Sequence, residues 1–170
     1  MNRQTLPARE TVNPAVQPRL GPARRILVAE DEAPLLEFTS RVLSFSGCEV
    51  DTAADGAAAW QALNSTGYDL LITDNDMPNI SGIDLLKKLR AARLFLPVIM
   101  ATGAFPEQEF IRYPWLRPDA TLLKPYTIED LLGTVEMVLR EAERAAGGAE
   151  AVTGNPIDQR LPTRRGARDS

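Results

Sequence analysis

The feature that most constrains the fold is a regular alternation between short apolar runs and longer segments in which apolar residues recur every three or four positions. Short apolar runs predict buried strands, and the longer spacing predicts amphipathic helices. The expected strands are residues 26–29, 48–52, 68–73, 97–101 and 121–123, and the expected helices are 34–46, 55–63, 81–89 and 127–139. Strands that alternate with helices predict a parallel sheet covered on both faces.

Polar residues in two of the expected strands indicate where those strands lie. The strand at 48–52 alternates apolar with acidic residues, and the strand at 121–123 begins with Thr, so both suit the edges of a sheet. The strands at 26–29, 68–73 and 97–101 are more apolar and suit its centre. We therefore expect an α/β fold with a doubly wound, five-stranded parallel sheet of the flavodoxin-like (βα)5 type. Its strand order is 2-1-3-4-5, and its ligand site lies at the carboxyl ends of the strands.

Residues 105–118 predict only a broken fourth helix, because Pro106 opens the segment and Pro114 and Pro118 interrupt it. The segment also holds four aromatic residues, Phe105, Phe110, Tyr113 and Trp115. These rings either pack irregularly in the core or present an apolar docking surface. The sequence leaves both readings open.

Proline, glycine and charge divide the chain into three parts. We expect a disordered N-terminal tail at 1–22, one domain at 23–146 and a disordered C-terminal tail at 147–170. The net charge of −4 is uneven, because residues 1–25 carry +4 and the body at 26–146 carries −9. An acidic body disfavours nucleic acid as the main partner. No apolar run is long enough for a membrane helix or a signal peptide, so we expect a cytoplasmic protein.

Two residue types are nearly or wholly missing. Cys48 is the only cysteine, which excludes an intrachain disulfide and a cysteine metal site, and the chain has no histidine. The absence of histidine removes zinc hydrolases, Ser-His-Asp nucleophiles and phosphohistidine carriers. Chemistry in this chain must therefore rest on carboxylates, lysine and hydroxyl groups.

Side chains of those types follow four of the five expected strands. Glu30 and Asp31 come after the first strand, Asp74 after the third, Thr102 after the fourth and Lys124 after the fifth. Each alone is more typical of a solvated loop or a turn. Together, three carboxylates converge at one edge of the sheet and repel one another unless a cation lies among them. Oxygen ligands without His or Cys favour Mg²⁺, beside which a carboxylate can accept a phosphoryl group.

This combination resembles the receiver domain of bacterial response regulators over residues 23–146. The matching segments are 26–32, 70–78 with Ser81-Gly82, 98–103 and 123–126. The resemblance implies that Asp74 is the phospho-acceptor, that Asp31 binds the metal directly and that Glu30 binds it mostly through water.

The resemblance assigns four further positions. The backbone carbonyl of Asp76 is the remaining metal ligand, Thr102 is the switch hydroxyl and Lys124 pairs with the phosphoryl group. The peptide bond before Pro125 is expected to be cis.

Two departures from the family pattern stand out. Thr121 occupies the position where the family often has an aromatic switch residue, and Tyr126 or Phe105 are candidates to replace it. Asp76 adds a fourth acid beside the acceptor, and our hypothesis is that it alters phosphoryl stability or metal affinity.

We therefore expect a stand-alone receiver of a two-component or phosphorelay system, in which Mg²⁺-dependent phosphorylation of Asp74 switches a protein-binding surface. The chain would catalyse its own modification and turn over no separate substrate. The expected partners are a histidine kinase or histidine phosphotransfer protein and a downstream protein target, with a homodimer through the fourth and fifth helices as a further candidate. We expect no DNA-binding domain, because only residues 147–170 follow the last helix, and no membrane contact.

Two alternatives remain. A receiver-like adaptor would bind partners independently of phosphorylation, which Thr121 and the broken fourth helix favour and the intact acidic cluster opposes. A haloacid-dehalogenase-type phosphatase also uses an Asp nucleophile and Mg²⁺, and Asp74-Asn75-Asp76 imitates its motif. That motif opens such domains, whereas two strands and two helices precede Asp74 here.

Overall fold

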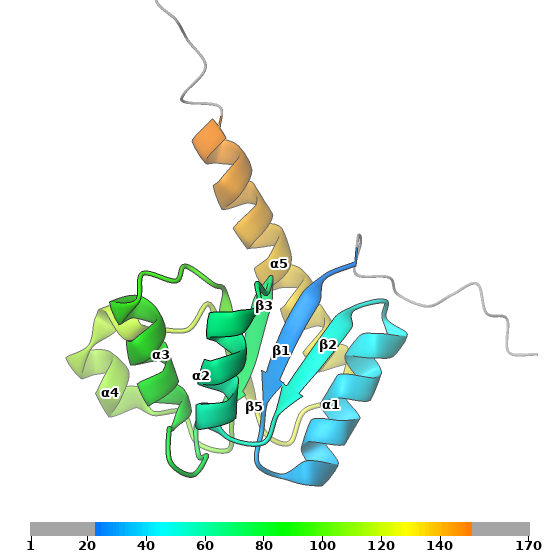
Figure 1. Cartoon of the computed structure of the whole chain (residues 1–170), viewed down its shortest axis with the longest axis horizontal. Helices are drawn as coiled ribbons and strands as arrows, with labels where there is room; N and C mark the ends of the chain where they lie inside the picture. The colour runs from blue at the N-terminus through cyan, green and yellow to red at the C-terminus, as the bar shows by residue number, and fades with distance from the viewer. Residues whose placement is uncertain (1–22, 151–170) are drawn as a thin grey trace, which may run out of the picture.

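The computed structural model describes residues 23–150 (Figure 1). The elements follow one another as β1 (Arg25–Ala29), α1 (Ala33–Phe45), β2 (Glu49–Ala53), α2 (Gly56–Ser65), β3 (Leu70–Asp74), α3 (Gly82–Ala91), β4 (Val98–Thr102), α4 (Glu107–Arg112), a 3₁₀ turn (Pro114–Leu116), β5 (Ala120–Leu123) and α5 (Ile128–Glu150). The five strands form one parallel sheet with the order β2-β1-β3-β4-β5. The expected fold class, strand order and edge positions are confirmed.

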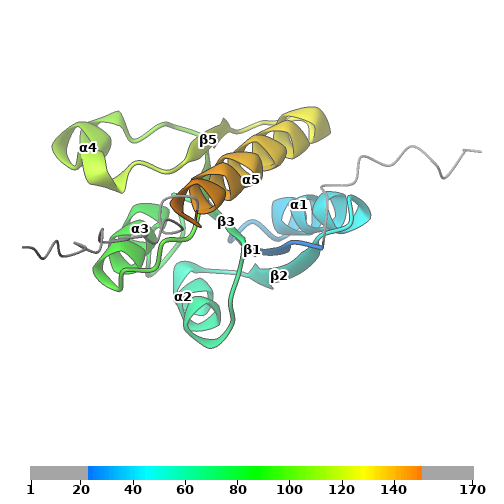
Figure 2. The same cartoon turned by 90° about the horizontal axis from the view of Figure 1, so that it is seen from above.

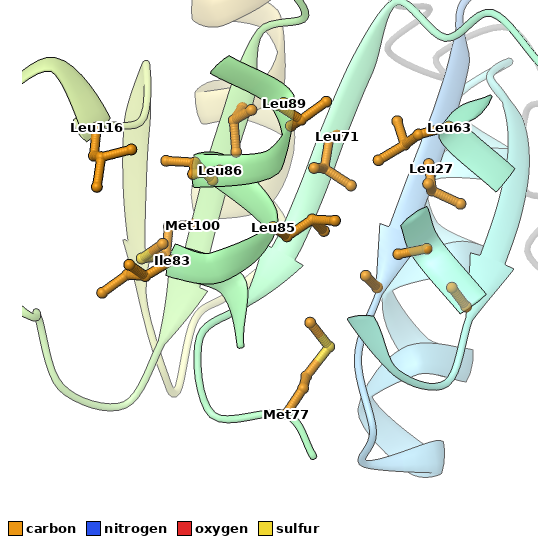
Figure 3. Close-up of a cluster of buried hydrophobic side chains, with 14 of the residues drawn as sticks. Leu27, Leu63, Leu71, Met77, Ile83, Leu85, Leu86, Leu89, Met100 and Leu116 are labelled. Carbon is orange, nitrogen blue, oxygen red and sulfur yellow. The ribbon is translucent and has the colours of Figure 1, made fainter. Parts of the chain in front are cut away.

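The sheet separates two apolar cores. Figure 2 shows α1 and α5 on one side of the sheet, with α2 and α3 on the other. Successive side chains of a strand point to opposite faces, so Leu27 of β1 packs toward α2 and α3 while Ile26 packs toward α1 and α5. The core under α2 and α3 appears in Figure 3, where Met77 points into it from the loop after β3. Both faces of the central strands are therefore buried, which explains their continuous apolar runs.

The helices begin where the sequence places their capping residues. Asp55 accepts a hydrogen bond from the backbone N–H of Ala58, and Ser81 accepts one from Asp84, at 2.7 Å and 3.2 Å. Each such bond satisfies a backbone donor that the first helical turn leaves free. Pro34 lies in the first turn of α1, as expected. Local signals therefore set where the connecting loops end.

The segment before β5 is irregular, as the prolines predict. Helix α4 has only six residues, and Pro114 begins the 3₁₀ turn that follows it. The aromatic residues differ in burial: Phe110 is buried in the core under α3, whereas Phe105 and Trp115 are exposed. A docking role for the exposed rings stays a prediction.

The last helix is longer than its apolar stripe predicts. Helix α5 continues to Glu150, so the domain boundary expected after residue 146 falls inside the helix. The other residues of the expected tails, 1–22 and 151–170, lie outside the described residues. Within residues 23–150, none of the helices combines the length and the apolar character needed to cross a bilayer.

Candidate functional site

Parallel pairing brings four strand ends to one edge of the sheet. Ala29 pairs with Thr73, Asp74 pairs with Ala101, and Thr102 pairs with Leu123. The residues that follow or end these strands therefore lie side by side, although they are distant in the sequence. This edge is where a doubly wound sheet binds its ligands.

Three carboxylates meet at this edge. One carboxylate oxygen from each of Glu30, Asp31 and Asp74 lies within 4.8 Å of the other two. Glu30 and Asp74 are buried, at 3% and 4% exposure, while Asp31 is open to solvent. Carboxylates that are packed this closely and shielded from water repel one another strongly. The cluster therefore favours a bound cation with oxygen ligands, and its exposed corner at Asp31 gives that cation access.

Lys124 provides part of the balancing charge. Its Nζ lies 2.7 Å from Asp74 Oδ2 and 2.7 Å from Glu30 Oε2, and 3.9 Å from the exposed Glu32. One lysine faces the three carboxylates of the cluster, so the cluster keeps an excess of negative charge. The residues therefore fit a divalent cation, and their all-oxygen donor set fits Mg²⁺.

The buried pairs shift two pKa values. Burial raises the pKa of the Glu30 carboxyl, and the hydrogen bond from Lys124 offsets only part of this effect. Burial lowers the pKa of Lys124, but its hydrogen bonds to Asp74 and Glu30 outweigh this effect, so the pKa is raised overall. The lysine therefore stays charged at neutral pH.

The loop after β3 holds the Asp74 carboxylate. The backbone N–H of Asp76 donates to Asp74 Oδ1 at 3.2 Å, while Lys124 holds Oδ2. The Asn75 side chain accepts a bond from Ile83 N at 3.3 Å, which ties the loop to the start of α3. The Asp76 side chain is exposed and accepts a bond from Asn75 Nδ2. The side chain of Asp76 therefore lies outside the three-carboxylate cluster.

Two glycines permit close approaches that the sequence analysis did not identify. A Cβ on Gly82 would lie 2.4 Å from the backbone oxygen of Asp74, and a Cβ on Gly56 would lie 2.1 Å from that of Ile80. No side chain fits at either distance, so α3 and α2 can press against the β3–α3 loop only through glycine. Their positions next to Ser81 and Asp55, at the expected starts of two helices, were the available signal.

Thr102 lies at the end of β4 and is fully buried. Its hydroxyl donates to the backbone oxygen of Ala104 at 3.0 Å and accepts from the backbone N–H of the same residue at 3.4 Å. The hydroxyl is therefore engaged with its own loop, which leads to Phe105 and α4.

Position 121 holds Thr where the family often has an aromatic switch residue, and Phe105 and Tyr126 were the candidates to replace that aromatic ring. Thr121 is half-buried in β5 and pairs with Met100. Phe105 packs its ring against Phe110, with the ring centroids 5.2 Å apart. Tyr126 follows the cis peptide between Lys124 and Pro125, and its hydroxyl lies 2.9 Å from Thr39 Oγ1 in α1. The contact between Tyr126 and Thr39 was not foreseen, because the two residues are far apart in the chain.

A comparison with models of known protein families agrees with the fold and the site described above. The sequence model of the response regulator receiver domain matches residues 26–136, which is more than half of the chain. The chain therefore belongs to this family, whose members are receiver domains of two-component response regulators. This membership removes the haloacid-dehalogenase alternative.

Individual relatives are longer than the chain. It is 30% identical over 142 residues to the transcriptional regulatory protein PrrA of Mycobacterium tuberculosis, an alignment that covers 83% of this chain and 61% of PrrA. It is 31% identical over 127 residues to the alkaline phosphatase synthesis transcriptional regulatory protein PhoP of Bacillus subtilis, covering 75% of this chain and 53% of PhoP. The chain thus spans between half and two thirds of the length of these curated relatives.

A solved structure shares the fold over nearly its whole length. The response regulator protein TrrA from Thermotoga maritima, solved in complex with Mg²⁺ and BeF, superposes with a TM-score of 0.61 and 30% identity. The alignment covers 68% of this chain and 98% of TrrA.

These relatives correct the expected set of partners. We expected a stand-alone receiver whose partners are a histidine kinase or histidine phosphotransfer protein and a downstream protein target, with a homodimer through the fourth and fifth helices as a candidate and no DNA-binding domain. PrrA and PhoP are transcriptional regulatory proteins, and the chain matches only part of each. The expectation of no DNA-binding domain is therefore wrong. It rested on the short stretch after the last helix, and the length of the sequence does not show which domains a receiver is joined to.

Proposed function

We propose that the protein accepts a phosphoryl group on Asp74 in an Mg²⁺-dependent reaction of a two-component or phosphorelay system, and that this modification switches a protein-binding surface. The observation that carries the proposal is that the Asp74 carboxylate lies between the acidic loop after β1 and the lysine after β5. The complex of TrrA with Mg²⁺ and BeF supports it. The adaptor alternative has less support, because it gives no role to the buried charges.

The residues of the site divide the binding of Mg²⁺ between them. Asp31 and Asp74 would bind the ion directly, Glu30 would bind it mostly through water, and the backbone carbonyl of Asp76 would complete the protein ligands. When bound, Mg²⁺ supplies positive charge to the phosphoryl oxygens and orients them toward the acceptor.

Asp74 is the nucleophile in the proposed reaction. A carboxylate oxygen of Asp74 attacks the phosphorus atom, forming a new P–O bond, and the bond from phosphorus to the leaving group of the donor breaks. The leaving group departs with the electron pair. Lys124, already 2.7 Å from the acceptor carboxylate, pairs with a phosphoryl oxygen of the product. The chain thus modifies itself and turns over no separate substrate.

Thr102 connects the modification to the surface. Its hydroxyl leaves Ala104 and donates to a phosphoryl oxygen, so the backbone groups of Ala104 lose their present partner. Ala104 directly precedes Phe105, whose ring packs on Phe110. A new conformation of this loop therefore alters the surface around α4, as a shift between two populated states.

Beryllofluoride, a mimic of a phosphoryl group, tests the proposal directly. We expect NMR amide shifts on adding beryllofluoride only when Mg²⁺ is present and Asp74 is intact, spreading from Asp74 to Thr102 and residues 105–126. The Asp74→Asn variant is the matched control, because it keeps the size of the side chain and removes the nucleophile. If the parent protein binds neither Mg²⁺ nor beryllofluoride, the assignment of Asp74 is wrong. Binding without propagated shifts supports the adaptor alternative instead.

The hypothesis on Asp76 has a separate test. Its carboxylate is exposed and lies two residues beyond the acceptor Asp74. It therefore adds negative charge near the phosphoryl group without joining the cluster. We expect the lifetime of the aspartyl phosphate to differ between the parent protein and Asp76→Asn, measured by loss of phosphoryl groups after the donor is removed. Equal lifetimes and equal Mg²⁺ affinities contradict the hypothesis.

A further inference from the structure

The loop that carries Lys124 is held at both of its ends. The backbone N–H of Lys124 donates to Thr102 O at 3.0 Å, which continues the pairing of β5 with β4. After two intervening residues, Thr127 and Asp130 cap α5 through three mutual hydrogen bonds of 2.8–3.1 Å. Only Pro125 and Tyr126 lie between these two anchors.

Tyr126 links this short loop to α1, which lies on the same side of the sheet as α5 (Figure 2). Its hydroxyl lies 2.9 Å from Thr39 Oγ1, and Thr39 is buried in the middle of α1, at 1% exposure. The ring of Tyr126 is half-buried against the core between α1, α5 and the sheet. A hydrogen bond between two hydroxyl groups in this shielded position holds the ring in one place, because breaking it leaves a buried polar group without a partner.

The link matters because α1 begins directly after the acidic loop. The β1–α1 segment and the β5–α5 segment are therefore joined at two points, Lys124 with Glu30 at 2.7 Å and Tyr126 with Thr39 at 2.9 Å. The two joints differ in what a phosphoryl group does to them. Lys124 must turn from the carboxylates to a phosphoryl oxygen, whereas the contact between the two hydroxyls takes no part in the reaction.

We propose that Tyr126 is a positioning residue, whose hydrogen bond to Thr39 holds the loop against α1 so that Lys124 remains aimed at the phosphoryl group when its ion pairs with Glu30 and Asp74 rearrange. This inference rests on the proposed function. It assigns no contact between Tyr126 and the reacting atoms, because the residue acts through Lys124.

Titration calorimetry with Mg²⁺ and beryllofluoride separates this role from a purely structural one. In Tyr126→Phe the ring is kept and the hydroxyl is lost. We expect the dissociation constant for beryllofluoride at saturating Mg²⁺ to rise by roughly three- to ten-fold, the range that one net hydrogen bond provides. The dissociation constant for Mg²⁺ alone should stay within about two-fold of the parent value, because a single hydrogen bond distant from Glu30, Asp31 and Asp74 carries none of their ligand charge.

A double-mutant cycle with Thr39 sharpens the test. Thr39→Val should weaken beryllofluoride binding as Tyr126→Phe does, and the double variant should be no weaker than either single variant, since both remove the same bond. Thr39→Ser keeps the hydroxyl and should bind as the parent does. Thermal unfolding without ligand checks that each variant is folded.

The outcomes distinguish this inference from the proposed function. If the parent binds beryllofluoride and Tyr126→Phe binds it equally well, the positioning role is wrong. If Mg²⁺ and beryllofluoride binding weaken together, the hydroxyls merely stabilise the fold, and the inference also fails. If the parent itself binds no beryllofluoride, the proposed function fails, and the inference fails with it.

Discussion

The two ends of the sheet each carry a cluster in which a basic side chain contacts a carboxylate, and the clusters differ in charge balance and burial. At the amino end, the amino-edge cluster consists of Arg25, Asp51 and Tyr68. Arg25 and the Tyr68 hydroxyl both donate to Asp51 Oδ2 at 2.8 Å, and the Asp51 side chain is 42% exposed. One cation meets one carboxylate, in contact with water.

At the carboxyl end, Lys124 meets Glu30 and Asp74 with Asp31 beside them, and the lysine side chain is only 15% exposed. Exposed balanced pairs contribute little to stability, whereas buried charges are costly unless every one is compensated. The comparison shows that the charges of the amino-edge cluster are already balanced, because one arginine meets one carboxylate. The carboxyl-end cluster is an arrangement that a cation and a phosphoryl group can complete.

The largest expected effect comes from removing the buried lysine. Lys124→Met leaves Glu30 and Asp74 without their cation, and we expect the free energy of unfolding to fall by about 3 kcal/mol in the absence of Mg²⁺. Urea denaturation measures the change. Arg41→Met is the control, because it removes an exposed ion pair with Glu37, and should cost less than about 1 kcal/mol. Equal effects of the two substitutions would contradict the distinction between the clusters.

Adding and removing the metal should give the next largest effect. At a Mg²⁺ concentration of about 100 times its dissociation constant, binding to the folded state alone stabilises the protein by about 2.7 kcal/mol. Adding EDTA should reverse the increase in the melting temperature, and Asp74→Asn should reduce it. Asp51→Asn, in the amino-edge cluster, should leave the increase unchanged. A metal-induced increase that survives Asp74→Asn undiminished argues for binding elsewhere.

A smaller effect is expected from filling the space beside Asp74. In Gly82→Ala the new Cβ lies 2.4 Å from the Asp74 backbone oxygen, so the loop must shift, at a cost of about 2 kcal/mol. Mg²⁺ affinity should fall as well, because Asp74 moves with its loop. Gly133→Ala, in the exposed part of α5 with open space around it, should instead stabilise the protein by up to about 1 kcal/mol. Chemical denaturation of both variants, with titrations of Mg²⁺, checks the contrast.

The smallest effect belongs to the amino-edge cluster. The Tyr68 hydroxyl and Arg25 lower the pKa of the Asp51 carboxyl. A pKa lowered by folding stabilises the protein above the ordinary carboxyl value, near pH 4, and this contribution is lost as the pH falls through the lowered value. Asp51→Asn should therefore cost less than about 1 kcal/mol at pH 7, given the exposure of the pair, and this cost should disappear as the pH falls through the lowered pKa of Asp51. If the loss of stability in Asp51→Asn does not depend on pH or salt, the substitution removes packing rather than charge.

Much of the fold could be predicted because its signals are local. Apolar periodicity predicts which faces of the strands and helices are buried. Asp55, Ser81 and Pro34 mark the starts of helices, because each acts on groups only three or four residues away. The end of α5 could not be predicted from its apolar stripe, because residues beyond Leu139 extend past the apolar core, where Glu143 pairs with the distant Arg24.

The site shows the same division between local and distant information. The sequence by itself determined which chemical groups stand at the ends of the strands, since the order of residues along the chain fixes which side chain comes after each strand. Only the tertiary structure decided that Lys124 pairs with both Glu30 and Asp74, and that the Tyr126 hydroxyl bonds to Thr39. It also decided that Phe110 is buried while Trp115 is exposed. Such contacts depend on the register of strands and the rotation of helices against them, and these are set by the packing of the whole core rather than by any local pattern.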